Sequence, residues 1–454
     1  MSGVLIRGGR LVDPVNGVDE QLDLLLADGV VRAIGESAAA AASATAAASA
    51  AGSGDAGEVI DATGQVVLPG LIDIHVHLRQ PGFEYKETLA SGLRAAASGG
   101  FTGVCPIPNT NPVSDTRPDM EFLRREARRL GLINLWPVGA VTIGQEGEQL
   151  TEFGELRKGG AVALSDDGHP IAQPAIMRRA LEYSKKHQLP ILVHGEELGL
   201  SDGGAMNEGP VATRLGLPGS PCAAESALIA RDIEIAALAG GRVHFMHVSC
   251  ARSVELIRRA RQEGVPVTAE TGPHYLHLTD EAVIGYRTNA KMYPPLRTSA
   301  DVAAVRAGVA DGTLGVVATD HAPHAAYEKA VEFDQAPNGI TGLETAVPLM
   351  VRLIDEGVIT WQQLALAMSS NPAQIIGVER GNLSLGAVAD VTVIDPELQW
   401  TYDETTCHSR SQNSPFWGHS LTGRATHCLV AGRPVLRDCQ VEARPAAAAE
   451  AVAG

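Results

Sequence analysis

The sequence predicts an α/β fold, a (β/α)8 TIM barrel with a small β-rich satellite domain built from both chain ends. Three observations lead to this prediction. Strand-like runs alternate with amphipathic helical stretches through the middle of the chain. The first 60 residues alternate apolar and polar positions around glycines. A similar pattern of turns and short strands returns past residue 380. With 454 residues, 45% of them hydrophobic, the chain can bury a large core and a smaller one.

The barrel prediction rests on eight short β-branched runs: LIDIHVHL, FTGVCPIP, INLWPVGA, AVALSDD, ILVHGEE, RVHFMHVS, VPVTAETG and LGVVATD. Helical candidates lie between them, such as ETLASGLRAAASGG, PDMEFLRREARRLG, PAIMRRALEYSKKHQ, AAESALIARDIEIAALAGG and SVELIRRARQEG, with another around 342–355. Eight alternating units of this kind indicate a barrel with parallel strands.

The chain ends supply the β-rich satellite domain. We expect its N-terminal part at 1–66, the barrel at 67–380 and the C-terminal part at 381–442. Residues 36–57 are nearly all Ala, Ser and Gly, which predicts a flexible surface insert, and 443–454 read as a disordered tail.

Composition excludes several classes of partner. Acidic residues outnumber basic ones by 53 to 36, a formal charge of −17, so nucleic acid and anionic membranes are not expected partners. The six cysteines are scattered without a CxxC pair, which fits neither a disulfide framework nor a structural zinc module. Without a signal peptide or an apolar span, we expect a cytoplasmic protein.

Polar residues at the predicted strand ends carry the chemistry, because barrel enzymes place catalytic groups there. His75 and His77 close the first strand on one side of it, so both imidazoles can face one ion. Buried-looking apolar runs also precede Asp166 and Asp167, His194, His247 and Asp320. Burying so many ionisable groups costs several kcal/mol unless a metal or ion pair compensates.

The set exceeds the needs of one tetrahedral zinc ion, which favours two metals sharing a carboxylate. Lys158 is a weaker candidate for a bridging group, since it precedes the fourth strand and two glycines intervene. His244 has the opposite strand parity to His247, which favours a hydrogen-bonded core histidine.

Further candidates surround this set. Arg79 follows the histidine pair by two residues and could hold a substrate carboxylate bidentately, while Asn109 emerges from the second strand. Asp320 is followed by His321 and His324 on the loop that leaves the eighth strand, and a metal-bound Asp320 could also carry a proton.

These motifs resemble the dihydroorotases of the amidohydrolase superfamily, in their class I type. DIHVHLRQPG and ATDHAPHAAYEK match the two family motifs, PNTNP, SDDG and KMYPPLR are also recognisable, and the similarity runs from about residue 1 to 440. The resemblance implies two Zn²⁺ per chain bridged by Asp167, with ligands His75, His77, Asp167, His194, His247 and Asp320.

The resemblance also implies a reaction, the reversible cyclisation of N-carbamoyl-L-aspartate to (S)-dihydroorotate in de novo pyrimidine synthesis. Asp320 would be the general acid or base, Arg79, Asn109 and His324 would bind the substrate carboxylate, and backbone around Asn338 and Gly339 would touch the ring. The chain departs from the family at Tyr293, where asparagine is usual, and at Asn338, where phenylalanine is common.

Two alternatives stay open. A related cyclic amidase, of the allantoinase or dihydropyrimidinase type, would share barrel and metals, but Arg79 and the aspartate bridge favour dihydroorotase. A non-catalytic partner of aspartate transcarbamoylase typically loses metal histidines, and this chain keeps them. The sequence leaves open a homodimer and an association with a transcarbamoylase.

Overall fold

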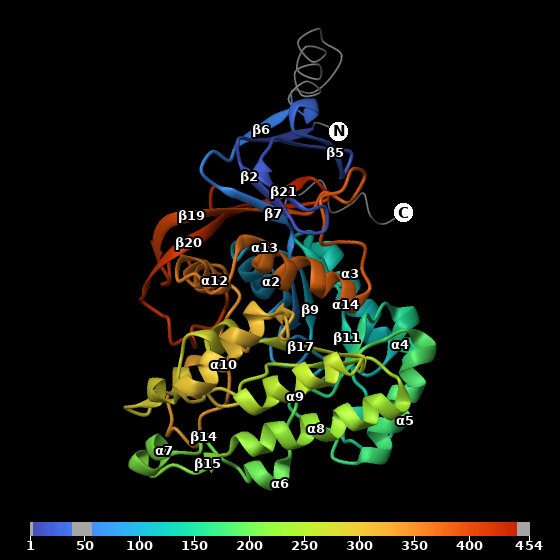
Figure 1. Cartoon of the computed structure of the whole chain (residues 1–454), viewed down its shortest axis with the longest axis vertical. Coiled ribbons are helices and arrows are strands. Elements are labelled where there is room, and N and C mark those ends of the chain that lie inside the picture. Colours follow the sequence, from blue (N-terminus) through green and yellow to red (C-terminus); the bar gives the residue numbers. More distant parts are fainter. Residues whose placement is uncertain (1–2, 39–56, 443–454) are drawn as a thin grey trace.

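The computed structural model describes residues 3–38 and 57–442 (Figure 1). The predicted insert at 36–57 lies almost wholly outside the described residues, and the predicted tail at 443–454 lies wholly outside them. Figure 1 shows the strands from the two ends of the chain at one end of the molecule and the helical part at the other. No helix in these two ranges is long and apolar enough to cross a membrane.

Both ends of the chain contribute to one seven-stranded sheet of order β22-β21-β20-β19-β7-β2-β3. β19 pairs antiparallel with β7, and β7 pairs parallel with β2, so strands more than 300 residues apart in the sequence are neighbours. Leu11, Val67, Val391 and Leu429 pack in one buried cluster beneath them. The bounds are β2 Arg10–Asp13, β3 Val18–Gln21, β7 Val66–Pro69, β19 Val391–Thr401, β20 Ser420–Val430, β21 Arg433–Arg437 and β22 Gln440–Val441.

A second sheet of order β5-β4-β1-β6 packs with the first at the same end of the molecule. Its strands are β1 Val4–Arg7, β4 Leu24–Ala27, β5 Val30–Ile34 and β6 Glu58–Asp61. The β-rich part therefore uses both chain ends, as the sequence pattern predicts. The domain bounds themselves stay a prediction.

The middle of the chain forms two parallel sheets, of order β10-β9-β8 and β11-β12-β13-β16-β17-β18. Each of the eight predicted runs contains a strand, but the third is split at Trp136 and Pro137, because proline has no N–H for the ladder. The bounds are β8 Leu71–Val76, β9 Phe101–Pro106, β10 Asn134–Leu135, β11 Val138–Gly139, β12 Ala163–Ser165, β13 Ile191–Val193, β16 Val243–Phe245, β17 Val267–Thr271 and β18 Val316–Val317.

Two details complete the strand pattern. An isolated parallel bridge joins Val76, at the end of β8, to His321, just beyond β18. A separate pair of short strands, β14 Met206–Asn207 and β15 Gly219–Ser220, lies in the connection between β13 and β16.

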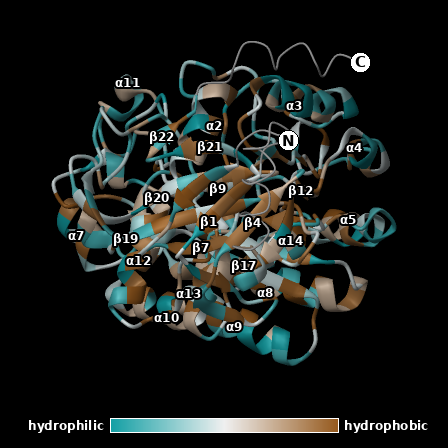
Figure 2. Cartoon of the chain, turned by 90° about the horizontal axis from the view of Figure 1, so that it is seen from above, coloured by the Kyte–Doolittle hydropathy of each residue, from teal (hydrophilic) through white to brown (hydrophobic). Residues whose placement is uncertain are grey.

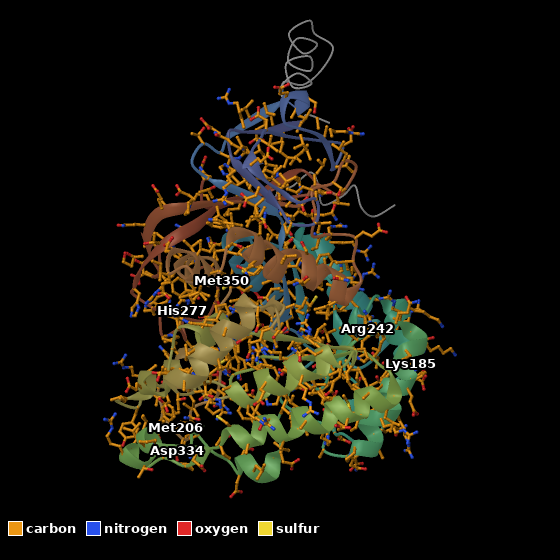
Figure 3. The ribbon with its side chains drawn as sticks, viewed as in Figure 1. Lys185, Met206, Arg242, His277, Asp334 and Met350 are labelled. Carbon is orange, nitrogen blue, oxygen red and sulfur yellow. The ribbon has the colours of Figure 1, made fainter. Side chains whose placement is uncertain are left out.

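Amphipathic helices cover the parallel strands. Figure 2 shows hydrophobic strands at the centre and helices with hydrophilic outer sides around them. The core is continuous across this region and includes Met350 of α12, which is fully buried and labelled in Figure 3. The longer helices are α2 Leu89–Ser98, α3 Arg117–Leu130, α5 Pro174–His187, α8 Cys222–Ala239, α9 Ala251–Gln262, α10 Ser299–Ala310 and α12 Ala346–Asp355.

Shorter helical segments connect these elements. They are α4 Phe153–Gly159, α6 Leu198–Ser201, α7 Pro210–Leu215, α11 Ala326–Lys329, α13 Trp361–Ala365 and α14 Asn371–Ile376. Single turns are η1 Ile143–Gln145, η2 Pro273–Leu276, η3 Asp280–Val283, η4 Thr288–Ala290 and η5 Leu366–Ser370. Helix α10 was not among the helices predicted from the sequence, since its alanine-rich run SADVAAVRAGVA carries few large apolar residues.

Candidate metal centre and active site

Six buried side chains converge at the C-terminal ends of the parallel strands. They come from β8 and the residues just after it, from the ends of β12 and β13, and from the loops after β16 and β18: His75, His77, Asp167, His194, His247 and Asp320. All but His75 line a cavity of about 180 Å³, whose wall also includes Arg79, Asn109, His324, Asn338 and Gly339. The structure thus brings together every site residue predicted from the sequence.

Asp167 lies between two pairs of imidazoles. Its Oδ2 is 3.6 Å from His75 Nε2 and 3.4 Å from His77 Nε2, and its Oδ1 is 3.4 Å from both His194 Nδ1 and His247 Nε2. Asp320 Oδ1 joins the first pair, 3.4 Å from His75 Nε2 and 3.0 Å from His77 Nε2. Each carboxylate oxygen of Asp167 therefore faces a different group of nitrogen donors.

The donor set fits metal ions. His75 Nε2 and Asp167 Oδ1 are buried and have no hydrogen-bond partner, a costly state for polar atoms unless something else binds them. His247 Nε2 and His194 Nδ1 approach to 2.8 Å, close enough to share one ligand. The ligand atoms of His75, His77 and Asp167, and those of Asp167, His194 and His247, lie within 4.8 Å of one another. Imidazole and carboxylate are donors that zinc uses.

Outer hydrogen bonds orient the first histidine pair. Glu270 Oε1 accepts from His75 Nδ1 at 2.6 Å, and its Oε2 accepts from His244 Nε2 at 2.9 Å. Asn109 Oδ1 accepts from His77 Nδ1 at 2.9 Å. With Nδ1 protonated in both rings, the Nε2 lone pairs of His75 and His77 face the carboxylates, as metal ligation requires. Burial acts to raise the pKa of Glu270, but His75 and His244 lower it to about 2.

Arg79 adds a positive charge to the lining of the cavity. Burial lowers the pKa of Arg79 to about 10, against the attraction of Asp320 and Asp167, so the guanidinium stays charged at neutral pH. Burial and the charges of Arg79 and Lys86 lower the pKa of His324 to about 2, so its ring is neutral. That ring donates from Nε2 to the Asn338 carbonyl oxygen at 2.7 Å.

The backbone is strained around this cavity. Arg79, His247 and Asp320 have positive φ values of 62°, 38° and 48°, which residues with a Cβ seldom adopt. Gly339 has a φ of 142°, and a Cβ there would lie 2.7 Å from the Ala322 carbonyl oxygen. Only glycine at position 339 therefore allows the loop to lie this close to Ala322 and the site.

Three polar residues named in the sequence analysis lie outside the set of six converging side chains. Asp166 accepts from the backbone N–H groups of Val141 and Thr142, and burial raises its pKa to about 6. Lys158 is exposed on α4 and pairs with Glu155 at 2.6 Å. His321 lies 3.3 Å from Glu87.

Besides Glu270, two neighbours of the site were not identified from the sequence. Glu196 lies 3.3 Å from His194 and accepts a hydrogen bond from the hydroxyl of Tyr293, whose ring centroid is 4.8 Å from that of His194. Asn413, from the loop between β19 and β20, accepts from the His324 backbone N–H at 2.9 Å and donates to the carbonyl of Gly339 at 3.0 Å. The run HGEE, which begins at His194, could have indicated Glu196 as a neighbour of the site. No local sequence pattern indicates Asn413.

Comparisons with known proteins agree with this geometry. Residues 64–253 match the family model described as dihydro-orotase-like. The dihydroorotase of Geobacter sp. (strain M21) is 50% identical over 432 residues, 95% of this chain and 99% of that protein. The dihydroorotase of Geobacter metallireducens is 49% identical over 434 residues, 96% of this chain and 99% of that protein.

Solved structures with a similar fold are hydantoinases and dihydropyrimidinases. The L-hydantoinase (dihydropyrimidinase) of Arthrobacter aurescens has a TM-score of 0.85 at 24% identity, covering 98% of each chain. The dihydropyrimidinase of Brevibacillus agri NCHU1002 has a TM-score of 0.81 at 25% identity, covering 97% of this chain and 96% of that one. The first of these likenesses concerns the fold alone, whereas the identity to the Geobacter proteins extends over nearly the whole sequence. The chain therefore belongs to the dihydroorotase family.

Proposed function

We propose that this chain is a zinc-dependent dihydroorotase that interconverts N-carbamoyl-L-aspartate and (S)-dihydroorotate in de novo pyrimidine synthesis. The observation that carries the proposal is the identity of about 50% to dihydroorotases over 95% of the chain. Asp167 and the five side chains that converge around it support the proposal, since a cyclic amidohydrolase needs such a metal-binding set.

Two Zn²⁺ ions are proposed, one held by His75 and His77 and the other by His194 and His247, with Asp167 as the shared ligand and Asp320 on the first. When bound, such ions supply Lewis-acid polarisation of the amide carbonyl and lower the pKa of a water molecule. The two separate faces of Asp167, each 3.4–3.6 Å from its own imidazoles, support this arrangement.

The remaining roles belong to the protein. Arg79, Asn109 and His324 bind the substrate carboxylate, for which the charged guanidinium of Arg79 is suited. Backbone around Asn338 and Gly339 contacts the ring. In the hydrolytic direction Asp320 accepts a proton from the attacking water and donates it to the ring nitrogen as the amide C–N bond breaks.

The architecture that holds these groups is a closed (β/α)8 barrel at 67–380 beside a β-rich domain formed by 1–66 and 381–442. The parallel bridge between Val76 and His321 supports closure, because it lies where the first and eighth strands would meet. The enzyme acts on a small molecule, and we place it in the cytoplasm.

The alternative substrate class is that of the dihydropyrimidinases, to which the fold is similar. The test is to purify the protein, count zinc per chain, and assay dihydroorotate and carbamoyl-aspartate beside dihydrouracil and hydantoin. We expect turnover of the first two only. Turnover of dihydrouracil, or no turnover with two zinc ions bound, would contradict the substrate assignment while leaving the metal site intact.

A further inference from the structure

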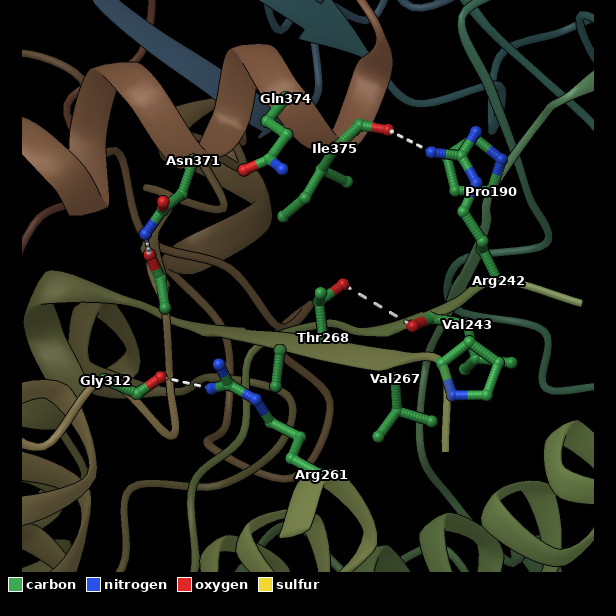
Figure 4. A pocket seen from close by; sticks show the side chains of 13 residues that line it. Pro190, Arg242, Val243, Arg261, Val267, Thr268, Gly312, Asn371, Gln374 and Ile375 are labelled. Atoms are coloured by element: carbon green, nitrogen blue, oxygen red, sulfur yellow. Dashed lines mark hydrogen bonds between the residues drawn. The ribbon is translucent and has the colours of Figure 1, made fainter. Parts of the chain in front are cut away.

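A second cavity, of about 330 Å³, lies at the opposite ends of the parallel strands from the metal centre. Pro190 precedes β13, Val243 begins β16 and Val267 begins β17, and all three line it. Because the strands are parallel, their N-terminal ends lie at the edge opposite His194 and His247. In Figure 4, Asn371 and Ile375 of α14 lie across this open cavity from the strand starts.

Two arginines supply the charge of this cavity. Arg242, labelled in Figure 3, donates to the carbonyl oxygens of Ile375, at 3.3 Å, and Gln188. Arg261 donates from Nη1 to the carbonyl oxygens of Gly312 and Thr313. The lining includes no Asp or Glu, and within residues 3–38 and 57–442 neither guanidinium lies in an ion pair.

The other arginines of α9 have acidic partners. Arg258 pairs with Asp311 at 2.7 Å, and Arg259 pairs with Glu263 at 2.8 Å. Arg261, on the same helix, has only carbonyl partners.

Free donors remain on both side chains. Among the described residues none accepts from Arg261 Nε or Nη2, or from Arg242 Nε. The hydrogen bonds of these two side chains use Nη1 of Arg261 and Nη1 and Nη2 of Arg242. Burial and the charge of Arg157 lower the pKa of Arg242, which reflects a positive charge that no nearby anion compensates. Figure 4 shows the two guanidiniums reaching the cavity from different elements.

The size and lining define the ligand. A guanidinium fork matches phosphate oxygens bidentately, and the free Nε and Nη2 of Arg261 form such a fork. Phosphate alone would leave much of a 330 Å³ cavity empty, since pockets of roughly 300 Å³ and more hold small organic ligands. Pro190, Val267 and Ile375 offer apolar contacts, and Asn371, whose Nδ2 donates to Gly315, keeps its Oδ1 as an acceptor.

We propose that this cavity binds a phosphate monoester on a compact ring body, of the class of a nucleoside monophosphate. The site is independent of the proposed dihydroorotase reaction, since it lies at the other ends of the strands and shares no lining residue with the active-site cavity.

The test titrates a nucleoside monophosphate, its parent nucleoside and inorganic phosphate into the zinc-loaded enzyme by calorimetry. We expect the monophosphate to bind, and the parent nucleoside to bind at least about tenfold more weakly, because it lacks the charged acceptor. Arg261→Gln should weaken monophosphate binding by about tenfold or more. Arg259→Gln, on the same helix but paired with Glu263, should leave the affinity unchanged.

Two further variants keep the outcome decisive. Arg261→Lys preserves the charge and a donor for the Gly312 carbonyl, so it should fold as the wild type and lose part of the affinity with the bidentate fork. Arg79→Gln alters the active site alone and should not change the affinity. Absence of monophosphate binding to the wild type, or loss of binding in Arg79→Gln with retention in both Arg261 variants, would overturn the proposal.

Discussion

Replacing Glu270 by glutamine should weaken metal binding although Glu270 is not a proposed ligand. Its buried carboxylate accepts from His75 Nδ1 at 2.6 Å and from His244 Nε2 at 2.9 Å. Glutamine has one acceptor oxygen and an NH2 group, so only one of these two N–H donors keeps its partner. If His75 loses it, the proton can move to Nε2, the atom that faces Asp167 and Asp320.

The expected loss follows from similar outer hydrogen bonds in metal sites, whose removal lowers metal affinity or activity about 10- to 100-fold. That corresponds to about 1.4 to 2.7 kcal/mol of binding free energy. The assay is zinc affinity by competition with a chelator, with the melting temperature as a check on folding. Glu344→Gln is the matched control, a buried carboxyl that contacts the backbone N–H of His408 instead. A Glu270→Gln enzyme with wild-type zinc affinity and kcat would refute the reasoning.

Three more outcomes are expected. Asp320→Asn should abolish turnover while the protein stays folded, because the amide cannot carry the proton; substantial residual activity would assign the proton to another group. Arg79→Gln should raise KM for dihydroorotate by roughly tenfold or more, because it loses a charge-assisted hydrogen bond to the substrate carboxylate. The KM of Arg79→Lys should lie between those of Arg79→Gln and the wild type. An unchanged KM in Arg79→Gln would show that Arg79 does not bind the carboxylate. Burial raises the pKa of Glu344 to about 7 from an ordinary 4.5, so the folded state holds this proton more tightly. Its stabilising effect is complete below about pH 4.5 and is lost as the pH rises to about 7, by about 3 kcal/mol. The free energy of unfolding in urea should therefore differ less between pH 5 and pH 8 in Glu344→Gln than in the wild type. The same difference in the variant and the wild type would contradict this prediction.

The strands and most site residues could be predicted from the sequence because both follow from local patterns. A β-branched run followed by a polar residue indicates a strand end, and the ends of parallel strands meet at one edge, which is how His75 and Asp320 come together. The same reasoning cannot see a partner that depends on register between distant strands. Glu270 in VPVTAETG reads as an ordinary strand residue until the structure places it against His75, 195 residues away.

Residues that reach the site from the β-rich part of the chain are harder still to predict. Asn413 lies in a loop between two strands of the β-rich sheet, yet it holds the backbone of His324 and Gly339 in the active-site wall. Nothing near it in the sequence has a barrel pattern. The departure at Tyr293 was visible in the sequence, but its contact with Glu196 required the structure, because the two residues are 97 positions apart.

The central claim is that Asp167 joins two metal ions, one on each of its carboxylate oxygens. Crystals of the zinc-loaded protein, with diffraction recorded at the zinc absorption edge, test it most directly. We expect two anomalous peaks, one between Asp167 and the pair His75 and His77, the other between Asp167 and the pair His194 and His247. A single peak, or peaks that Asp167 does not touch, would contradict it.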